Sequence, residues 1–142
     1  MENIYTCEIL GTNLTTKDNS TVNDLCSIDY LNINSYDESF ILLKDSSCPI
    51  EINIYSYNQS FVENVCAIFL ANLIAENQSK IQMNSSFVCP QKTIINGKDQ
   101  GEILEICASQ IMNIIATQSS IITMNSTHNC PNETQIISTD QT

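Results

Sequence analysis

The segment CPIEINIYSYNQSFVENVC, residues 48–66, returns 41 residues later as CPQKTIINGKDQGEILEIC, residues 89–107. Both copies begin with Cys-Pro, continue through an isoleucine-containing run and end in a second cysteine 18 residues after the first. Identical residues continue beyond that cysteine, as far as Asn84-Ser85 in one copy and Asn125-Ser126 in the next. Self-similarity at a fixed period predicts a repeat architecture, in which each unit buries its apolar face against its neighbours.

The first cysteine of each unit sets the unit boundaries, because these cysteines follow each other at intervals of 41 residues. The resulting division is a tail of a preceding unit (1–6), three units (7–47, 48–88 and 89–129) and the start of a fourth, incomplete unit (130–142). Residues 1–20 contain neither the basic nor the apolar region of a signal peptide. We therefore expect the chain to be a segment of a longer array, or to be completed by a partner chain.

Within one unit the pattern predicts a strand, a helix and a second strand. Ile50, Ile52 and Ile54 alternate with polar residues, as on one face of a strand. Ser60-x-x-Glu63 then matches a capping box, and apolar residues recur at helical spacing over residues 62–73. The expected fold class is thus an α/β (α+β) tandem repeat of strand-helix-strand units of about 41 residues, stapled by disulfides.

Seven cysteines in 142 residues indicate an oxidising compartment. Two pairing schemes fit the spacing, and sequence alone does not choose between them. Pairing between units joins Cys26 to Cys48, Cys66 to Cys89 and Cys107 to Cys130, and leaves Cys7 unpaired within the segment; pairing within units joins Cys7 to Cys26, Cys48 to Cys66 and Cys89 to Cys107. The expected strand-helix-strand geometry favours the between-unit scheme. A metal site is not expected, because the cysteines are widely spaced and His128 is the single histidine.

The chain is rich in acceptor sequences for N-linked glycans, Asn-x-Ser/Thr. These sequons occur at Asn13, Asn19, Asn58, Asn77, Asn84, Asn125 and Asn132. Part of this number follows by chance from the 17 asparagines in the chain. The excess predicts N-linked glycans and, with the cysteines, an extracellular or cell-surface location.

A second set of asparagines recurs at one phase of the repeat, six residues after the second cysteine of each unit. Its members are Asn32, Asn72 and Asn113. A buried asparagine needs hydrogen-bond partners, so the recurrence suggests a ladder of amide hydrogen bonds between stacked units. The alternative is that these asparagines lie at an exposed edge of an asparagine-rich protein.

Charge and composition exclude several classes of function. The net charge of -11, with 5 basic residues in all, provides no surface for nucleic acid or anionic lipid. The longest apolar run, residues 65–75, is too short to span a membrane. No arrangement of nucleophile and base is apparent, so we expect neither an enzyme nor a cofactor.

The sequence therefore predicts an extracellular structural glycoprotein. In this interpretation the chain is a subunit or segment of a fibre, filament or surface coat that self-associates or extends as a long tandem array. The alternative is a secreted or cell-surface binding module, such as a surface antigen or a signalling ligand.

Overall fold

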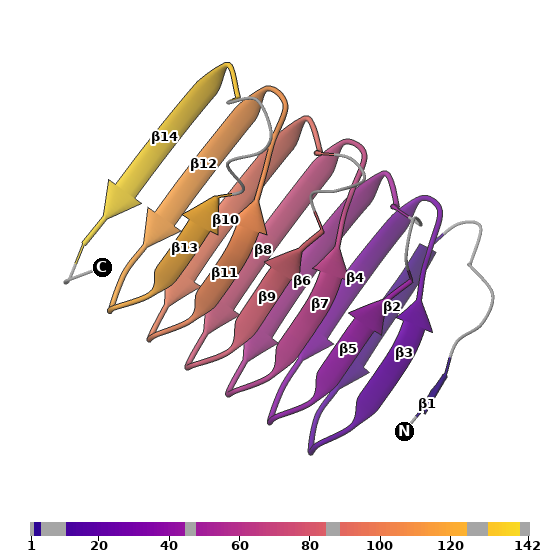
Figure 1. Cartoon of the computed structure of the whole chain (residues 1–142). Helices are drawn as coiled ribbons and strands as arrows, with labels where there is room; N and C mark the ends of the chain where they lie inside the picture. The colour runs from indigo at the N-terminus through magenta and orange to yellow at the C-terminus, as the bar shows by residue number, and fades with distance from the viewer. Residues whose placement is uncertain (1, 4–10, 45–47, 85–88, 125–130, 140–142) are drawn as a thin grey trace.

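The computed structural model describes residues 2–3, 11–44, 48–84, 89–124 and 131–139. In these residues the chain forms two seven-stranded sheets in which every neighbouring pair of strands is parallel. Successive strands alternate between the two sheets, so that the chain winds forward as a parallel β-solenoid (Figure 1). No helix that could cross a membrane occurs in the described ranges.

The odd-numbered strands form one sheet, here called the odd-strand sheet: β1 (Glu2–Asn3), β3 (Thr21–Leu25), β5 (Phe40–Leu43), β7 (Phe61–Val65), β9 (Lys80–Met83), β11 (Glu102–Ile106) and β13 (Ile121–Met124). The even-numbered strands form the even-strand sheet: β2 (Gly11–Thr16), β4 (Tyr30–Ser35), β6 (Glu51–Tyr57), β8 (Leu70–Glu76), β10 (Lys92–Lys98), β12 (Ile111–Ala116) and β14 (Glu133–Ser138).

One coil of the solenoid consists of an even-numbered strand and the odd-numbered strand that follows it, from β2–β3 to β12–β13. Residues paired across the even-strand sheet are alternately 19 and 21 or 22 positions apart, as in Asn13↔Asn32, Asn32↔Asn53 and Leu70↔Lys92. Each 41-residue sequence unit therefore corresponds to two coils.

The core lies between the two sheets and is made by alternate residues of each strand. In β6, Ile52 and Ile54 are buried while their neighbours Glu51, Asn53 and Tyr55 are partly exposed. Val62 and Val65 of β7, in the odd-strand sheet, are fully buried on the other side of the same core. Because each sheet packs on the other through one face only, the strands alternate between apolar and polar residues.

The described residues contain strands and no helix, so the strand-helix-strand prediction is wrong. The misleading helical spacing comes from a bulge in β7, where the pairing register shifts between Val62 and Val65. A bulge places two outward residues between two inward ones, and this produces the three-residue spacing of a helix. Ser60 is a turn residue rather than a helix cap, and Phe69 is about half exposed (52%).

Short turns join each even-numbered strand to the next odd-numbered strand. Every one of these turns has two consecutive residues with positive φ, such as Asn58 (φ 59°) and Gln59 (φ 63°). Asparagine and aspartate tolerate this left-handed conformation better than most residues. They supply the first of the two positions in five of the six turns, at Asp18, Asp37, Asn58, Asn77 and Asp99.

Buried hydroxyl groups fill the core beside these turns. Ser60 Oγ donates to the Ser35 carbonyl oxygen over 2.8 Å and lies 2.6 Å from Ser56 Oγ. It also accepts a hydrogen bond from the Tyr57 backbone N–H. The hydroxyl groups thus satisfy backbone groups that the tight turns leave without ladder partners.

Candidate functional site: the outer face of the even-strand sheet

A column of asparagines lies on the outer face of the even-strand sheet. The strand register aligns Asn13, Asn32, Asn53 and Asn72 on consecutive strands from β2 to β8. Asn32 Nδ2 donates to Asn13 Oδ1, and Asn53 Nδ2 donates to Asn32 Oδ1, each over 2.8 Å. These contacts form a ladder of side-chain amides along the solenoid axis.

The structure places the three asparagines singled out in the sequence in the same column, on strands rather than on a helix. Asn32 is in the middle of the ladder, whereas Ile94 of β10 lies between Asn72 and Asn113. The isoleucine side chain has no hydrogen-bonding group, so the column of amides is interrupted at β10. Sequence reasoning missed Asn13 and Asn53, although the 19- and 21-residue intervals from Asn13 to Asn53 were a detectable signal of single coils.

Three tyrosines gather on the same face near the turns. Tyr36 packs edge-on against the rings of Tyr55 and Tyr57, with centroid distances of 5.8 and 6.2 Å. Tyr55 Oη donates to Glu76 Oε2 over 2.8 Å. Burial, the hydrogen bond to Glu76 and the charge of Glu76 together raise the pKa of Tyr55 to about 12, because each disfavours the phenolate.

Between the amide column and the tyrosines is a shallow hollow of about 150 Å³. Its polar lining consists of amides and one phenol, contributed by Asn32, Asn34, Asn53, Asn72 and Tyr55. No side chain that lines it is charged. The hollow can accept hydrogen bonds and apolar contacts, and it offers nothing to a charged ligand.

The outer face of the even-strand sheet carries charges of both signs. Its outward charges are Glu51, Glu76, Lys92, Lys98 and Glu133. The outer face of the odd-strand sheet instead carries Asp24, Glu63, Glu102 and Glu105 against Lys80. In a chain with net charge -11, the even-strand face is therefore nearly balanced, with three carboxylates against two lysines.

The turns form a polar edge beside this face, and they contain ladders of their own. Asn58 Nδ2 donates to Asp37 Oδ1 over 2.7 Å, and Gln78 Nε2 donates to Gln100 Oε1 over 3.0 Å. Three predicted glycan acceptors, Asn19, Asn58 and Asn77, lie in these turns. A second polar hollow, of about 550 Å³, follows the same edge and includes Asn77 and Gln100 in its lining.

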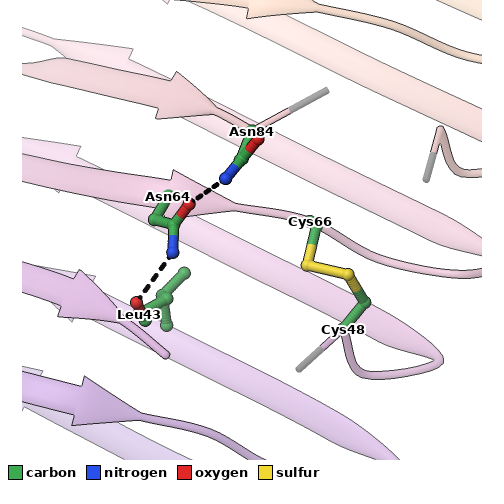
Figure 2. Close-up of a disulfide and its surroundings, with 5 residues drawn as sticks. All are labelled: Leu43, Cys48, Asn64, Cys66 and Asn84. Atoms are coloured by element: carbon green, nitrogen blue, oxygen red, sulfur yellow. Dashed lines mark hydrogen bonds between the residues drawn. A yellow bond between two sulfur atoms is a disulfide. The ribbon is translucent and has the colours of Figure 1, made fainter. Parts of the chain in front are cut away.

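The remaining predicted acceptors are dispersed. Asn13 is exposed on β2, and Asn132 is exposed just before β14. Asn84 follows β9 and donates from Nδ2 to Asn64 Oδ1, while Asn64 Nδ2 donates to the Leu43 carbonyl oxygen over 3.0 Å (Figure 2). Asn125 lies outside the described residues. The structure thus gives six acceptor positions, none of them in the core.

Disulfides close alternate coils. Cys48 is bonded to Cys66 (Figure 2) and Cys89 to Cys107, each pair 18 residues apart. The within-unit pairing therefore holds at these four cysteines, and the favoured Cys66–Cys89 pairing is wrong. After one coil the chain lies beside the point where that coil began, so the second cysteine of a unit meets the first cysteine of the same unit. Cys26 is also disulfide-bonded. Cys7 and Cys130 lie outside the described residues.

Among the residues that the structure describes, no group of three or more His, Cys, Asp or Glu side chains is arranged to hold a metal ion. His128 is outside these ranges.

The disulfides indicate an oxidising environment.

Comparison with known proteins identifies no relative of this chain. The chain matches no protein-family model, and neither a curated protein nor a solved structure matches it.

Proposed function

We propose that the protein is a non-enzymatic structural element of an extracellular assembly, in which further solenoid coils extend the stack along its axis into a fibre, filament or surface coat. The added coils come from a longer array of the same chain or from a second copy. The observation that carries the proposal is the combination of a uniform coil register with a covalent staple in alternate coils.

The strand β14 supports this proposal. It keeps the register of β12 without a shift, from Ile111↔Glu133 to Ala116↔Ser138. Its other edge has no strand neighbour in the described ranges, and Ile136 and Ile137 are 64% and 56% exposed. A sheet edge with exposed isoleucines is a template for another strand, and a further coil of the same repeat fits it.

The proposed N-linked glycans suit such an assembly because none of their described acceptors lies in the core between the two sheets. Asn58 and Asn77 occupy equivalent positions in neighbouring turns, about 4.8 Å apart along the axis. We expect two glycans to crowd each other at this spacing, so that each molecule carries at most one of the two.

Electron microscopy of the protein secreted from a glycosylating host, together with fibre diffraction, tests the structural role. We expect filaments with an axial spacing of about 4.8 Å. Glycan mapping of the same material checks that Asn58 and Asn77 are not occupied together. Monodisperse particles without axial order would contradict the structural role and favour a secreted binding module instead.

A further inference from the structure

We infer that the tyrosine cluster on the even-strand face is a site of oxidative crosslinking, at which the rings of Tyr36 and Tyr55 become joined by a carbon–carbon bond. This inference rests on the proposed extracellular structural role and adds a covalent joint between coils. The co-reactant is hydrogen peroxide, delivered through a haem peroxidase.

The fold brings the two rings together from neighbouring coils. Tyr36 directly follows β4, and Tyr55 lies on β6, the next strand of the same sheet. Their ring centroids are 5.8 Å apart, with an angle of 68° between the ring planes. In such an edge-on pair the carbons at the edge of one ring, which include those ortho to the hydroxyl group, approach the other ring. Both side chains are partly exposed, so a surface oxidant reaches them, and the broad χ2 torsion of tyrosine lets the rings turn toward each other.

Tyr57 completes the cluster, but its ring is less well placed for the same bond. It is stacked on Tyr55 with an interplanar angle of 16°, so these two rings present faces rather than edges to each other. Its centroid lies 6.2 Å from that of Tyr36, which is farther than the Tyr36–Tyr55 distance. The ring of Tyr57 therefore packs beside the reacting pair, and its hydroxyl group is not required.

Glu76 provides an acceptor for the phenol proton of Tyr55 during oxidation. Tyr55 Oη donates to Glu76 Oε2 over 2.8 Å. Because the pKa of Tyr55 is raised to about 12, its side chain is a neutral phenol at neutral pH, and the proton has to leave together with the electron. A carboxylate that is already hydrogen-bonded to the phenol accepts this proton directly. Of the three clustered tyrosines, Tyr55 alone donates to a carboxylate in the described ranges, so we expect it to be oxidised first.

The crosslinking reaction is a two-electron oxidation by one molecule of peroxide. The peroxidase takes one electron from Tyr55, whose proton passes to Glu76, and one electron from Tyr36, whose proton passes to water. The two phenoxyl radicals then couple through a new bond between carbons ortho to their oxygens. The hydrogen on each of these carbons moves through water to the oxygen of the same ring, which restores two phenols. The two electrons and two protons that were released reduce the peroxide to two water molecules, so the chain loses two hydrogen atoms.

The crosslink joins two coils that the disulfides do not join. The bond between Cys48 and Cys66 closes the coil of β6 and β7 on itself. Tyr36 lies in the turn between β4 and β5, in the preceding coil, whereas Tyr55 belongs to β6. A bond between these tyrosines therefore spans the axial step from one coil to the next, which is the direction in which a fibre is pulled.

The experiment treats the secreted chain with a haem peroxidase and hydrogen peroxide, and follows the product by dityrosine fluorescence and peptide mapping. We expect a chain lighter by two hydrogen atoms and a crosslinked peptide pair that contains Tyr36 and Tyr55. Because the bond forms within one chain, its rate should not change when the protein is diluted. The treated chain should also unfold at a higher urea concentration than the untreated chain, since a crosslink restricts the unfolded state.

Conservative variants distinguish this site from general oxidation of surface tyrosines. Tyr36→Phe and Tyr55→Phe each remove one reacting phenol and should abolish the mapped crosslink. Tyr57→Phe keeps its ring, and Tyr30→Phe removes an exposed phenol elsewhere on the same face, so both should retain the crosslink. Glu76→Gln removes the proton acceptor and should slow the crosslinking by about tenfold or more. Circular dichroism of each variant establishes that the fold is retained.

Crosslinks that form only between chains, that map to Tyr57 or Tyr30 instead, or that form at an unchanged rate in Glu76→Gln would overturn this inference. Electron microscopy of the same material separates it from the proposed function. Filaments of a chain that forms no intrachain crosslink overturn the crosslink alone, and an intrachain crosslink in a chain that forms no filaments overturns the axial role alone.

Discussion

Asn53 Nδ2 lies 2.8 Å from Oδ1 of Asn32, the residue directly beside it on the preceding strand of the even-strand sheet. Asn32 in turn donates to Asn13. Asn32 therefore takes part in two amide hydrogen bonds, one as acceptor and one as donor. Asn113, in the same column, has Ile94 and Gln135 as its neighbours.

We expect Asn32→Ala to lower the free energy of unfolding by about 1–2 kcal/mol, since a typical hydrogen bond contributes about 1 kcal/mol. Asn113→Ala is the matched control and should change the stability by less than about 0.5 kcal/mol. Urea unfolding monitored by circular dichroism measures both. Equal losses in the two variants would show that the amide ladder does not stabilise the solenoid.

The buried serines beside the turns provide a second matched pair. Ser60 Oγ hydrogen-bonds to Ser35, Ser56 and Tyr57, whereas the buried Ser120 Oγ has no partner in the described residues. Ser60→Ala should destabilise the protein by about 1–3 kcal/mol, because it leaves buried backbone groups unsatisfied.

Ser120→Ala should leave the stability unchanged or raise it, because an unpaired buried hydroxyl is removed. Thermal and urea unfolding of the two variants measure the contrast. A destabilisation by Ser120→Ala as large as that by Ser60→Ala would mean that Ser120 has a partner the structure does not contain.

The repeat period was predictable from sequence because it depends on cysteines and asparagines at fixed intervals. Its interpretation as one strand-helix-strand unit was wrong, since each unit contains two coils. Column neighbours such as Asn32 and Asn53 are separated by a single coil, and this shorter interval was the overlooked signal. The alternation at Ile52 and Ile54 was interpreted correctly as a strand, because β6 has the simple two-residue period.

The helix prediction failed at the bulges for a physical reason. Val62 and Val65 both point inward although three positions separate them, because Asn64 adopts a left-handed conformation (φ 69°). The same conformation recurs at Asp24 and Glu105, in β3 and β11. Sequence spacing alone does not distinguish such a bulge from a helical turn. The near balance of charge on the even-strand face was not predictable either, because it requires knowing which strands are adjacent.

The bulge at Asn64 makes a direct prediction about stability. A β-branched residue is strained at positive φ by about 1–2 kcal/mol, and the hydrogen bond to the Leu43 carbonyl is lost as well. We therefore expect Asn64→Val to destabilise the protein by about 2–3 kcal/mol. Asn64→Gly relieves the strain and loses only the side-chain hydrogen bonds, so its cost should be about 1 kcal/mol. Similar losses for valine and glycine, measured by urea unfolding, would contradict a strained bulge.

The disulfide between Cys48 and Cys66 should stabilise the solenoid by closing one coil. Its sequence separation of 18 residues corresponds to about 3 kcal/mol in the chain-entropy model. We expect the double variant Cys48→Ser/Cys66→Ser to lose about that amount in chemical unfolding at constant pH. Peptide mapping without reduction should recover Cys48 linked to Cys66 in the wild type, and recovery of Cys66 linked to Cys89 would contradict the coil closure.

Tyr55 should make the stability depend on pH at the alkaline end. Its pKa is raised from 10.0 to about 12, first by burial and then by Glu76, so the folded state holds the phenol proton more tightly than the unfolded state does. The resulting stabilisation is fully present below about pH 10 and is lost as the pH rises through about 12. A spectrophotometric titration should contain a tyrosine component with a midpoint near pH 12, and Tyr55→Phe should remove that component. Glu76→Gln should lower the midpoint of the Tyr55 component toward pH 10 without reaching pH 10, because the burial of Tyr55 remains. A wild type without a tyrosine component near pH 12 would contradict the Tyr55–Glu76 contact.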